Sequence, residues 1–245
     1  MTLYDECVDL QVKLEAAQAA DAGLELLARG QRLVDALEKT RTYLVRTAQL
    51  PAALRSGSSP ALDDKTVTQA IGAFRGGLSR HGVSAFQHQP AATLVDVAKA
   101  QRDKCARWVA TRWRGVFTPY EEDMERAASG RLVGELSQRL AAQRRASTLR
   151  TARGYDPVEQ RGDLERLLGG QQVEDWLHAI TTIGDELHAS LARLDSARNA
   201  MTPEVRDALH RAASEDGLPF SDLTSELVAA IRAAGVDDQL VVRHQ

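Results

Sequence analysis

Apolar residues recur every seven positions in the segment 171–200, and this repeat constrains the fold more than any other feature of the chain. The repeat has two rows of side chains, which are Val173, Ile180, Leu187 and Leu194, and then Trp176 and Ile183. Such a repeat places these side chains on one face of an α-helix, where they can pack against a second helix. We therefore expect a helix–helix interface along these six residues, either inside the chain or with another chain.

Helical spacing of apolar residues extends over most of the sequence. Ala and Leu supply most of the apolar residues, aromatic residues make up only 4%, and the β-branched runs typical of strands are nearly absent. The short run 240–242 is the only candidate strand. The remaining predicted helices are 2–49, 63–80, 90–114, 118–151, 157–168, 203–216 and 224–234. The sequence therefore predicts an all-α fold, in which long amphipathic helices form a helical bundle or coiled-coil body.

The predicted helix 118–151 begins with a capping signature. Thr118 can accept a hydrogen bond from a free backbone N–H, Pro119 lacks the donor that would be orphaned there, and Glu121 can reach back. The apolar stripe of this helix, which we expect to face the core, is Leu132, Val133, Leu136 and Leu140.

Signals for helix starts and ends become dense after residue 200. Thr202-Pro203 starts a short helix that ends before Gly217, and a second short helix is closed by Gly235. We therefore expect a long-helix body over 1–200 and a small C-terminal helical cap over 201–245.

The net charge of −3 conceals a basic middle and an acidic C-terminal third. Residues 99–114 carry six basic side chains against one acid, and residues 126–153 carry seven arginines against one glutamate. Residues 156–245 carry 17 acidic and 8 basic side chains. The basic middle either faces an acidic surface, of this chain or of another subunit, or contacts nucleic-acid phosphates. The candidate contact residues are Arg107, Arg112, Arg114, Arg139, Arg144, Arg145, Arg150 and Arg153.

The segment 107–114 interleaves two tryptophans with three arginines. This combination can stack on bases while its charges meet phosphates. However, Trp108 and Trp113 are five residues apart, about 140° around a helix, so they do not form one stacking platform. Trp108 and Arg112 are four residues apart, and we expect them to form a cation–π pair within the protein.

Sequence motifs for catalysis or cofactor binding are missing. There is no Walker phosphate loop, dinucleotide glycine fingerprint or His-Glu-x-x-His helix. The Asp-x-x-His pairs that begin at Asp175 and Asp185 lie on one predicted helix and flank its apolar rows, so we interpret them as solvated side chains rather than metal ligands. Cys7 and Cys105 are expected to be core thiols. We therefore expect no cofactor, no metal ion and no enzymatic activity.

The acidic N-terminus is unlike a signal peptide, and no apolar run approaches the ~20 residues that span a bilayer. We therefore expect a cytoplasmic protein without a membrane partner. Its predicted function is that of a non-catalytic helical interaction protein, an accessory or scaffolding subunit of a larger complex. Its partners would be other protein subunits, or a second copy bound through the heptad rows. The alternative is a nucleic-acid-binding helical module that uses the basic segment 99–153 to contact DNA or RNA.

Overall fold

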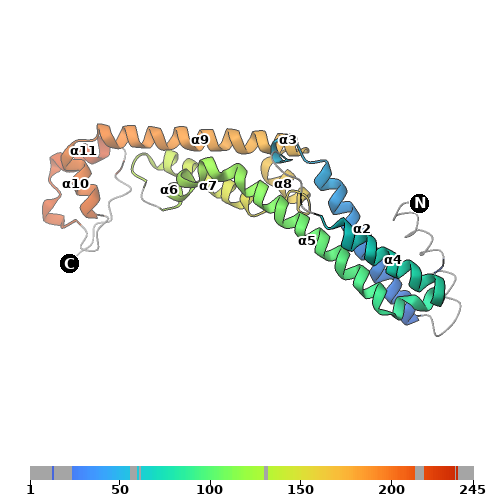
Figure 1. Ribbon diagram of the computed structural model, residues 1–245. Coiled ribbons are helices and arrows are strands. Elements are labelled where there is room, and N and C mark those ends of the chain that lie inside the picture. Colours follow the sequence, from blue (N-terminus) through green and yellow to red (C-terminus); the bar gives the residue numbers. More distant parts are fainter. Residues whose placement is uncertain are drawn as a thin grey trace. The chain divides into compact units, whose positions relative to one another are not determined.

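The computed structural model describes residues 13, 24–55, 60, 62–129, 132–212, 218–234 and 236 (Figure 1). These residues form helices and connecting turns with no strand, so the predicted all-α helical bundle is confirmed. The candidate strand 240–242 and Cys7 lie outside the described residues. The chain divides into two compact units. Unit 1 holds the described residues up to Trp113 together with Asp156–Arg161, and unit 2 holds Arg114–Tyr155 and the described residues from Gly162 onwards.

Unit 1 is built around three long helices, which Figure 1 shows side by side. They are α2 (Leu24–Ala48), α4 (Asp64–His81) and α5 (Gln89–Phe117), with the short helix α3 (Ala52–Arg55) after α2 and the 3-10 helix η2 (Gly82–Gln87) between α4 and α5. Asp63 caps α4, because its carboxylate accepts a hydrogen bond from the backbone N–H of Thr66 at 3.0 Å. Their shared core consists of Leu33, Leu37, Ala70, Phe74, Phe86, Ala91, Leu94 and Ala98.

In unit 2, two helices replace the single helix predicted over 118–151. After the 3-10 helix η3 (Thr118–Tyr120), α6 (Glu121–Ala128) ends and α7 (Leu136–Arg153) begins only eight residues later. Gly134 lies in this break with a φ of 140°, a backbone conformation that favours glycine. A Cβ at this position would lie 2.6 Å from Leu194 Cδ2, so the break also brings the backbone close to α9.

The expected apolar stripe of α7 is also wrong in part. Leu136 and Leu140 are 46% and 42% exposed, whereas Leu132 is buried and Val133 is half-buried. The core-facing residues of α7 are instead Ala142, Ala146, Leu149 and Ala152. Small side chains on the buried face let α7 approach α6 and α9 closely, and Figure 1 shows α7 alongside α9. The two leucines are turned towards solvent as a result.

The remainder of unit 2 consists of α8 (Arg161–Leu168), α9 (Val173–Ala200), α10 (Pro203–Ala212), the 3-10 helix η4 (Phe220–Asp222) and α11 (Ser225–Ala233). A cluster that includes Val205, Leu209 and Ile231 forms the core of the C-terminal helices, and Val133 packs against it. These helices belong to the same unit as α9. The boundary predicted at residue 200 stays a prediction.

Candidate functional site

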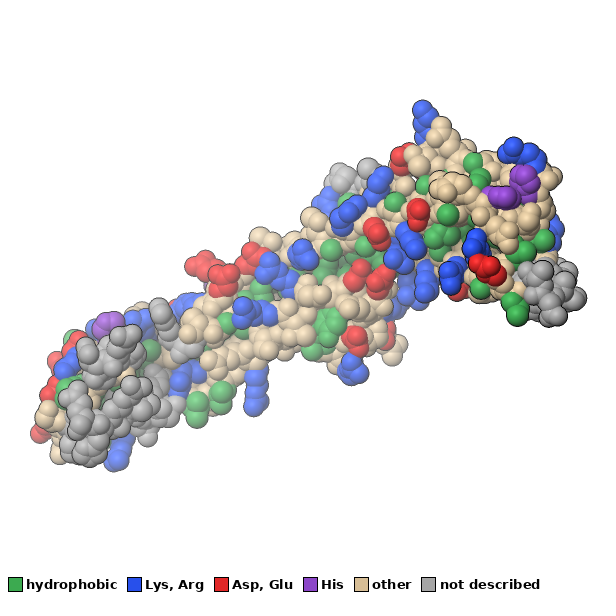
Figure 2. All heavy atoms as spheres, turned by 90° about the horizontal axis from the view of Figure 1, so that it is seen from below, with side chains coloured by type: hydrophobic (Ala, Val, Ile, Leu, Met, Phe, Trp, Pro, Cys, Tyr) green, Lys and Arg blue, Asp and Glu red, His purple; other side chains and the backbone are tan. Residues whose placement is uncertain are grey.

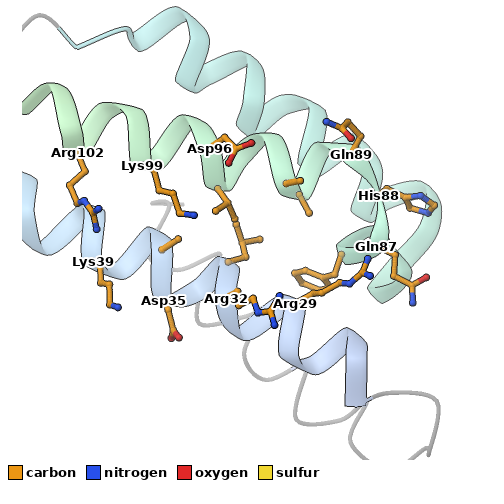
Figure 3. A pocket seen from close by; sticks show the side chains of 16 residues that line it. Arg29, Arg32, Asp35, Lys39, Gln87, His88, Gln89, Asp96, Lys99 and Arg102 are labelled. Carbon is orange, nitrogen blue, oxygen red and sulfur yellow. The ribbon is translucent and has the colours of Figure 1, made fainter.

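A hollow of about 600 Å³ lies along α2 and the first half of α5 in unit 1 (Figure 3). We call it the basic groove, because its rim carries five basic side chains against the two carboxylates of Asp35 and Asp96. The basic side chains are Arg29, Arg32 and Lys39 from α2 and Lys99 and Arg102 from α5. On the face shown in Figure 2, Lys and Arg side chains are spread along the surface, and several of them lie close together around apolar side chains, with Asp and Glu nearby.

Helical spacing places the rim residues in rows. Arg29, Arg32 and Lys39 are three and seven residues apart on α2, so their side chains leave the helix on nearly the same face. Lys99 and Arg102 are three apart on α5, and Figure 3 shows both side chains extending from α5 towards α2. The buried Thr40 hydroxyl lies where the two helices meet, 2.7 Å from the carbonyl oxygen of Ala36 in its own helix and 3.3 Å from that of Ala98 on α5.

The cations of the basic groove differ in the partners that the chain supplies. Arg29 pairs with Glu25 one turn earlier at 2.7 Å, and Arg102 lies 3.6 Å from its neighbour Asp103. Arg32, Lys39 and Lys99 have no carboxylate partner among the residues that the structure describes. These three exposed cations can therefore receive the acidic groups of a bound molecule.

The floor of the basic groove is apolar. It consists of Leu33, Ala36, Phe86, Ala91, Ala92 and Val95. Leu33, Phe86 and Ala91 belong to the core beneath, whereas Ala36 and Val95 are half-buried and Ala92 is exposed. Gln87, His88 and Gln89 close one end, at the turn into α5 (Figure 3). The site therefore combines positive charge with a strip of small apolar side chains.

A second hollow of about 380 Å³ continues along α2 and shares Asp35, Lys39 and Arg102 with the basic groove. Val158 and Glu159 form part of its wall. This part of the chain is held to α2 by the Tyr43 hydroxyl, which donates a hydrogen bond to Asp156 at 2.7 Å. Burial first, and then the hydrogen bond and charge of Asp156, raise the pKa of Tyr43 well above its ordinary value of 10.0.

Several of the arginines predicted to contact a partner are engaged within the chain. Arg145 pairs with Glu186 of α9 at 2.8 Å, and Arg153 pairs with Glu121 of α6 at 2.7 Å. Arg139 donates to the carbonyl oxygen of Gly134 at 2.9 Å. Arg112 lies over the ring of Trp108, 5.8 Å from its centroid, as its spacing predicted. For Arg145 and Arg153, acidic residues of the same unit supply the counter-charge.

The other four predicted arginines, Arg107, Arg114, Arg144 and Arg150, are exposed. None of them has a carboxylate partner within the described part of the chain. Arg144 and Arg150 are both on α7, but a six-residue separation turns them by about 120° around the helix axis. They therefore do not form one row that could follow a phosphate backbone.

The two tryptophans of the segment 107–114 do not form a surface on which bases could stack. Trp113 is fully buried and Trp108 is half-buried. The Nε1 atom of Trp108 is itself buried and has no hydrogen-bond partner among the described residues. These rings therefore present no exposed aromatic pair to nucleic-acid bases.

The heptad rows of α9 lie largely inside the chain. Trp176, Ile180, Leu187 and Leu194 are buried, while Val173 and Ile183 are half-buried. α9 packs against α7 and α6 along this length. Of the two alternatives that the sequence left open, the buried rows form internal core.

The 3-10 helix η3 approaches α9 closely, next to charged contacts between α6 and α9. A Cβ on Gly184 would lie 2.4 Å from the ring of Tyr120, so only glycine fits beneath that ring. On the adjoining surface, Asp123 lies 2.9 Å from His188 Nδ1. Arg126 pairs with Asp195 on the same side.

Reactive side chains do not converge in the described residues. Cys105 is a buried core thiol as predicted, and burial raises its pKa. His81 and His88 lie next to each other at the surface, with ring centroids 4.7 Å apart. Within the described ranges, no group of three or more His, Cys, Asp or Glu residues could hold a metal ion.

The basic side chains of α2 were missed by the sequence interpretation, although a signal was present. Arg29, Arg32, Lys39 and Arg46 recur at spacings of three and seven, which is a helical stripe. Glu25, Asp35 and Glu38 lie close to them in the sequence, so residues 25–46 carry only two more basic than acidic side chains. Only the approach of α5 adds Lys99 and Arg102 to this stripe.

None of the described helices is long and apolar enough to cross a membrane. Comparison of the chain with protein-family models, with curated proteins and with solved structures finds no match.

Proposed function

We propose that this chain is a non-catalytic interaction protein, an accessory or scaffolding subunit of a larger cytoplasmic complex, and that the basic groove is where a partner docks. One observation carries the proposal. Arg32, Lys39 and Lys99 are exposed around an apolar floor, and none of them forms an ion pair within the described part of the chain.

Complementary charge around an apolar strip is the usual arrangement of a protein interface. The apolar floor contributes affinity when it loses water, and the charged rim accelerates association and selects the partner. In unit 2, by contrast, the apolar rows of α9 already pack within the chain. The basic groove is therefore the surface on which we place the partner.

The proposal is tested by recovery of partners from an extract of the native host, with the purified full-length chain as bait. A groove variant, Arg32→Glu/Lys39→Glu/Lys99→Glu, removes the charge of the rim. The matched control, Lys65→Glu/Arg193→Glu/Arg198→Glu, reverses three exposed cations that do not line the groove. We expect the wild type and the control to recover the same partner in equal amounts, and the groove variant to recover at least about tenfold less. Equal recovery by all three proteins would contradict the proposal.

A second candidate function is nucleic-acid binding, which is favoured by the exposure of Arg114, Arg144 and Arg150 in unit 2. These arginines differ from Arg139, Arg145 and Arg153, which are engaged within the chain. Anisotropy of labelled DNA and RNA across a salt series tests it, with the variant Arg114→Glu/Arg144→Glu/Arg150→Glu. If this function operates, the logarithm of affinity falls linearly with the logarithm of salt concentration, by about 0.9 per duplex phosphate contacted, and the variant loses binding.

A further inference from the structure

We infer that the basic groove binds an acidic amphipathic helix of a partner protein, with its apolar stripe on the floor and its carboxylates on the rim. The inference rests on the proposed function and names the chemistry of its partner. It follows from the charge, the floor and the dimensions of the groove.

Charge complementarity identifies the partner as acidic. Arg32 and Lys39 stand on the α2 side and Lys99 on the α5 side, so a molecule lying between the helices meets cations on both flanks. Carboxylates on both edges of a bound helix could form ion pairs with these three cations, which have none with the described residues. A basic helix would instead meet an excess of like charge.

The floor and the length of the groove suit a helix. Arg29 and Lys39 are ten residues apart on α2, which is about 15 Å, or nearly three helical turns. The half-buried Ala36 and Val95 and the exposed Ala92 are small or medium-sized, so the backbone of a partner can approach closely. An amphipathic helix presents apolar residues at spacings of three and four to such a strip.

Nucleic acid fits the same groove poorly. Asp35 and Asp96 lie among the cations, and Glu38 and Glu159 line the adjoining hollow. A phosphate backbone carries a negative charge on every nucleotide and would meet these carboxylates along its path, whereas a helix can place neutral residues opposite them.

Two aromatic rings line the basic groove within the described residues. Phe86 is only 4% exposed, and His88 lies at one end, with its ring against that of His81. Bases would therefore find no stacking surface along the floor, and only the His88 ring at that end.

The test is direct binding of labelled peptides to the full-length chain, measured by anisotropy. The first peptide is a helix of about four turns with a Leu/Ala stripe flanked by Glu. The second has the same composition with a scrambled order, the third has Lys in place of each Glu, and a single-stranded oligonucleotide of equal charge is the fourth ligand. We expect saturable binding of the first peptide alone, weakened by salt. Equal binding of the scrambled peptide, preferential binding of the oligonucleotide, or no binding of the first peptide would overturn the inference.

Two variants locate the bound helix. The variant Arg32→Glu/Lys39→Glu/Lys99→Glu should bind the first peptide at least about tenfold more weakly, because each attraction at the rim becomes a repulsion. Ala92→Trp should reduce the affinity for the first peptide to a similar extent without changing any charge, since the ring would occupy the exposed part of the floor. Ala100→Trp, on an exposed position of α5 that does not line the groove, is the matched control. Unchanged affinity in both groove variants, with helical content intact by circular dichroism, would place the peptide elsewhere and overturn the inference.

Failure of the inference and failure of the proposed function give different results. If the groove variant loses the partner from the native extract but no acidic helix binds, the groove docks a partner of another chemistry. If the acidic helix binds but recovery of native partners does not depend on the groove, the proposed function fails.

Discussion

Two sets of basic side chains, one in each unit, differ in whether the described chain pairs them with carboxylates. In unit 2, Arg145 and Arg153 reach Glu186 and Glu121 across neighbouring helices. In unit 1, Arg32, Lys39 and Lys99 surround a hollow and have no such partner among the described residues. The comparison shows that arginine content does not locate an interaction surface by itself, because the fold neutralises some basic segments and leaves others exposed.

Apart from truncation of a fully buried leucine, the largest loss of stability is expected at Gly184 of α9, where the Tyr120 ring lies close to the helix backbone. Gly184→Ala places a Cβ about where the Tyr120 ring now lies, so the ring of this η3 residue must move away from α9. We expect a loss of about 1–3 kcal/mol in the free energy of unfolding, measured by urea titration.

Gly115→Ala is the control for that substitution. Gly115 also lies within a helix, α5, but a Cβ there meets no atom within 4 Å. The change should stabilise the chain by up to about 1 kcal/mol, because alanine is the better helix former. Equal changes in the free energy of unfolding of the two variants would contradict the close approach of the Tyr120 ring to α9.

The hydrogen bond from Tyr43 to Asp156 is the corresponding contact of unit 1. Tyr43→Phe should cost about 1–2 kcal/mol, because a part-buried acceptor loses its donor.

This contact also has a pH signature. Since the folded pKa of Tyr43 is raised above its ordinary value of 10.0, its contribution is fully present below about pH 10 and is lost as the pH rises further. Wild-type stability should therefore fall above pH 10 more steeply than that of Tyr43→Phe. Parallel pH profiles of the two proteins would show that the hydroxyl is not held as described.

A smaller effect separates a paired arginine from an unpaired one. Arg145→Gln should destabilise the chain by about 0.3–1 kcal/mol, because it breaks a partly exposed ion pair with Glu186. Arg32→Gln should change stability by less than this, since it has no carboxylate partner among the described residues. A double-mutant cycle with Glu186→Gln measures the pair itself, and a coupling energy of zero would remove the contrast between the units.

The smallest effect is expected at Leu140. Its side chain is 42% exposed, so Leu140→Gln should change the free energy of unfolding by less than about 0.5 kcal/mol. Leu149→Ala is the comparison, because Leu149 is fully buried on the same helix and its truncation should cost about 2–5 kcal/mol. A large loss in the free energy of unfolding for Leu140→Gln would indicate that Leu140 faces the core, as the sequence predicted.

Periodicity predicted the helices well because most of them bury one broad face. The α9 rows are the clearest case, and four of their six side chains are buried. The prediction went wrong at α7, where apolarity pointed to Leu136 and Leu140 while the helix buries alanines. Residue spacing cannot show how closely two helices approach, and that distance decides whether alanine or leucine fits the core.

The sequence shows the two basic segments of the basic groove, but not that they come together. The α2 stripe follows from the spacing of Arg29, Arg32 and Lys39, and the 99–114 segment had already been identified as basic. Their meeting depends on the turn that folds α5 back beside α2, and on the shared core formed there by Phe74 and Phe86. The number of charged residues along the sequence cannot show that α2 and α5 lie side by side.

The short stretch Asp156–Arg161 has a consequence for how this protein can be divided. It belongs to unit 1, while the residues immediately before and after it belong to unit 2. Arg114–Tyr155 is thus a segment of unit 2 inserted between two segments of unit 1. The second of these segments is bound to α2 by the hydrogen bond from Tyr43 to Asp156. During synthesis, Asp156–Arg161 is translated only after α6 and α7, so unit 1 cannot be complete until both of these helices have been made. No single proteolytic cut can release either unit whole, so separating their roles calls for point substitutions or a permuted chain rather than truncation.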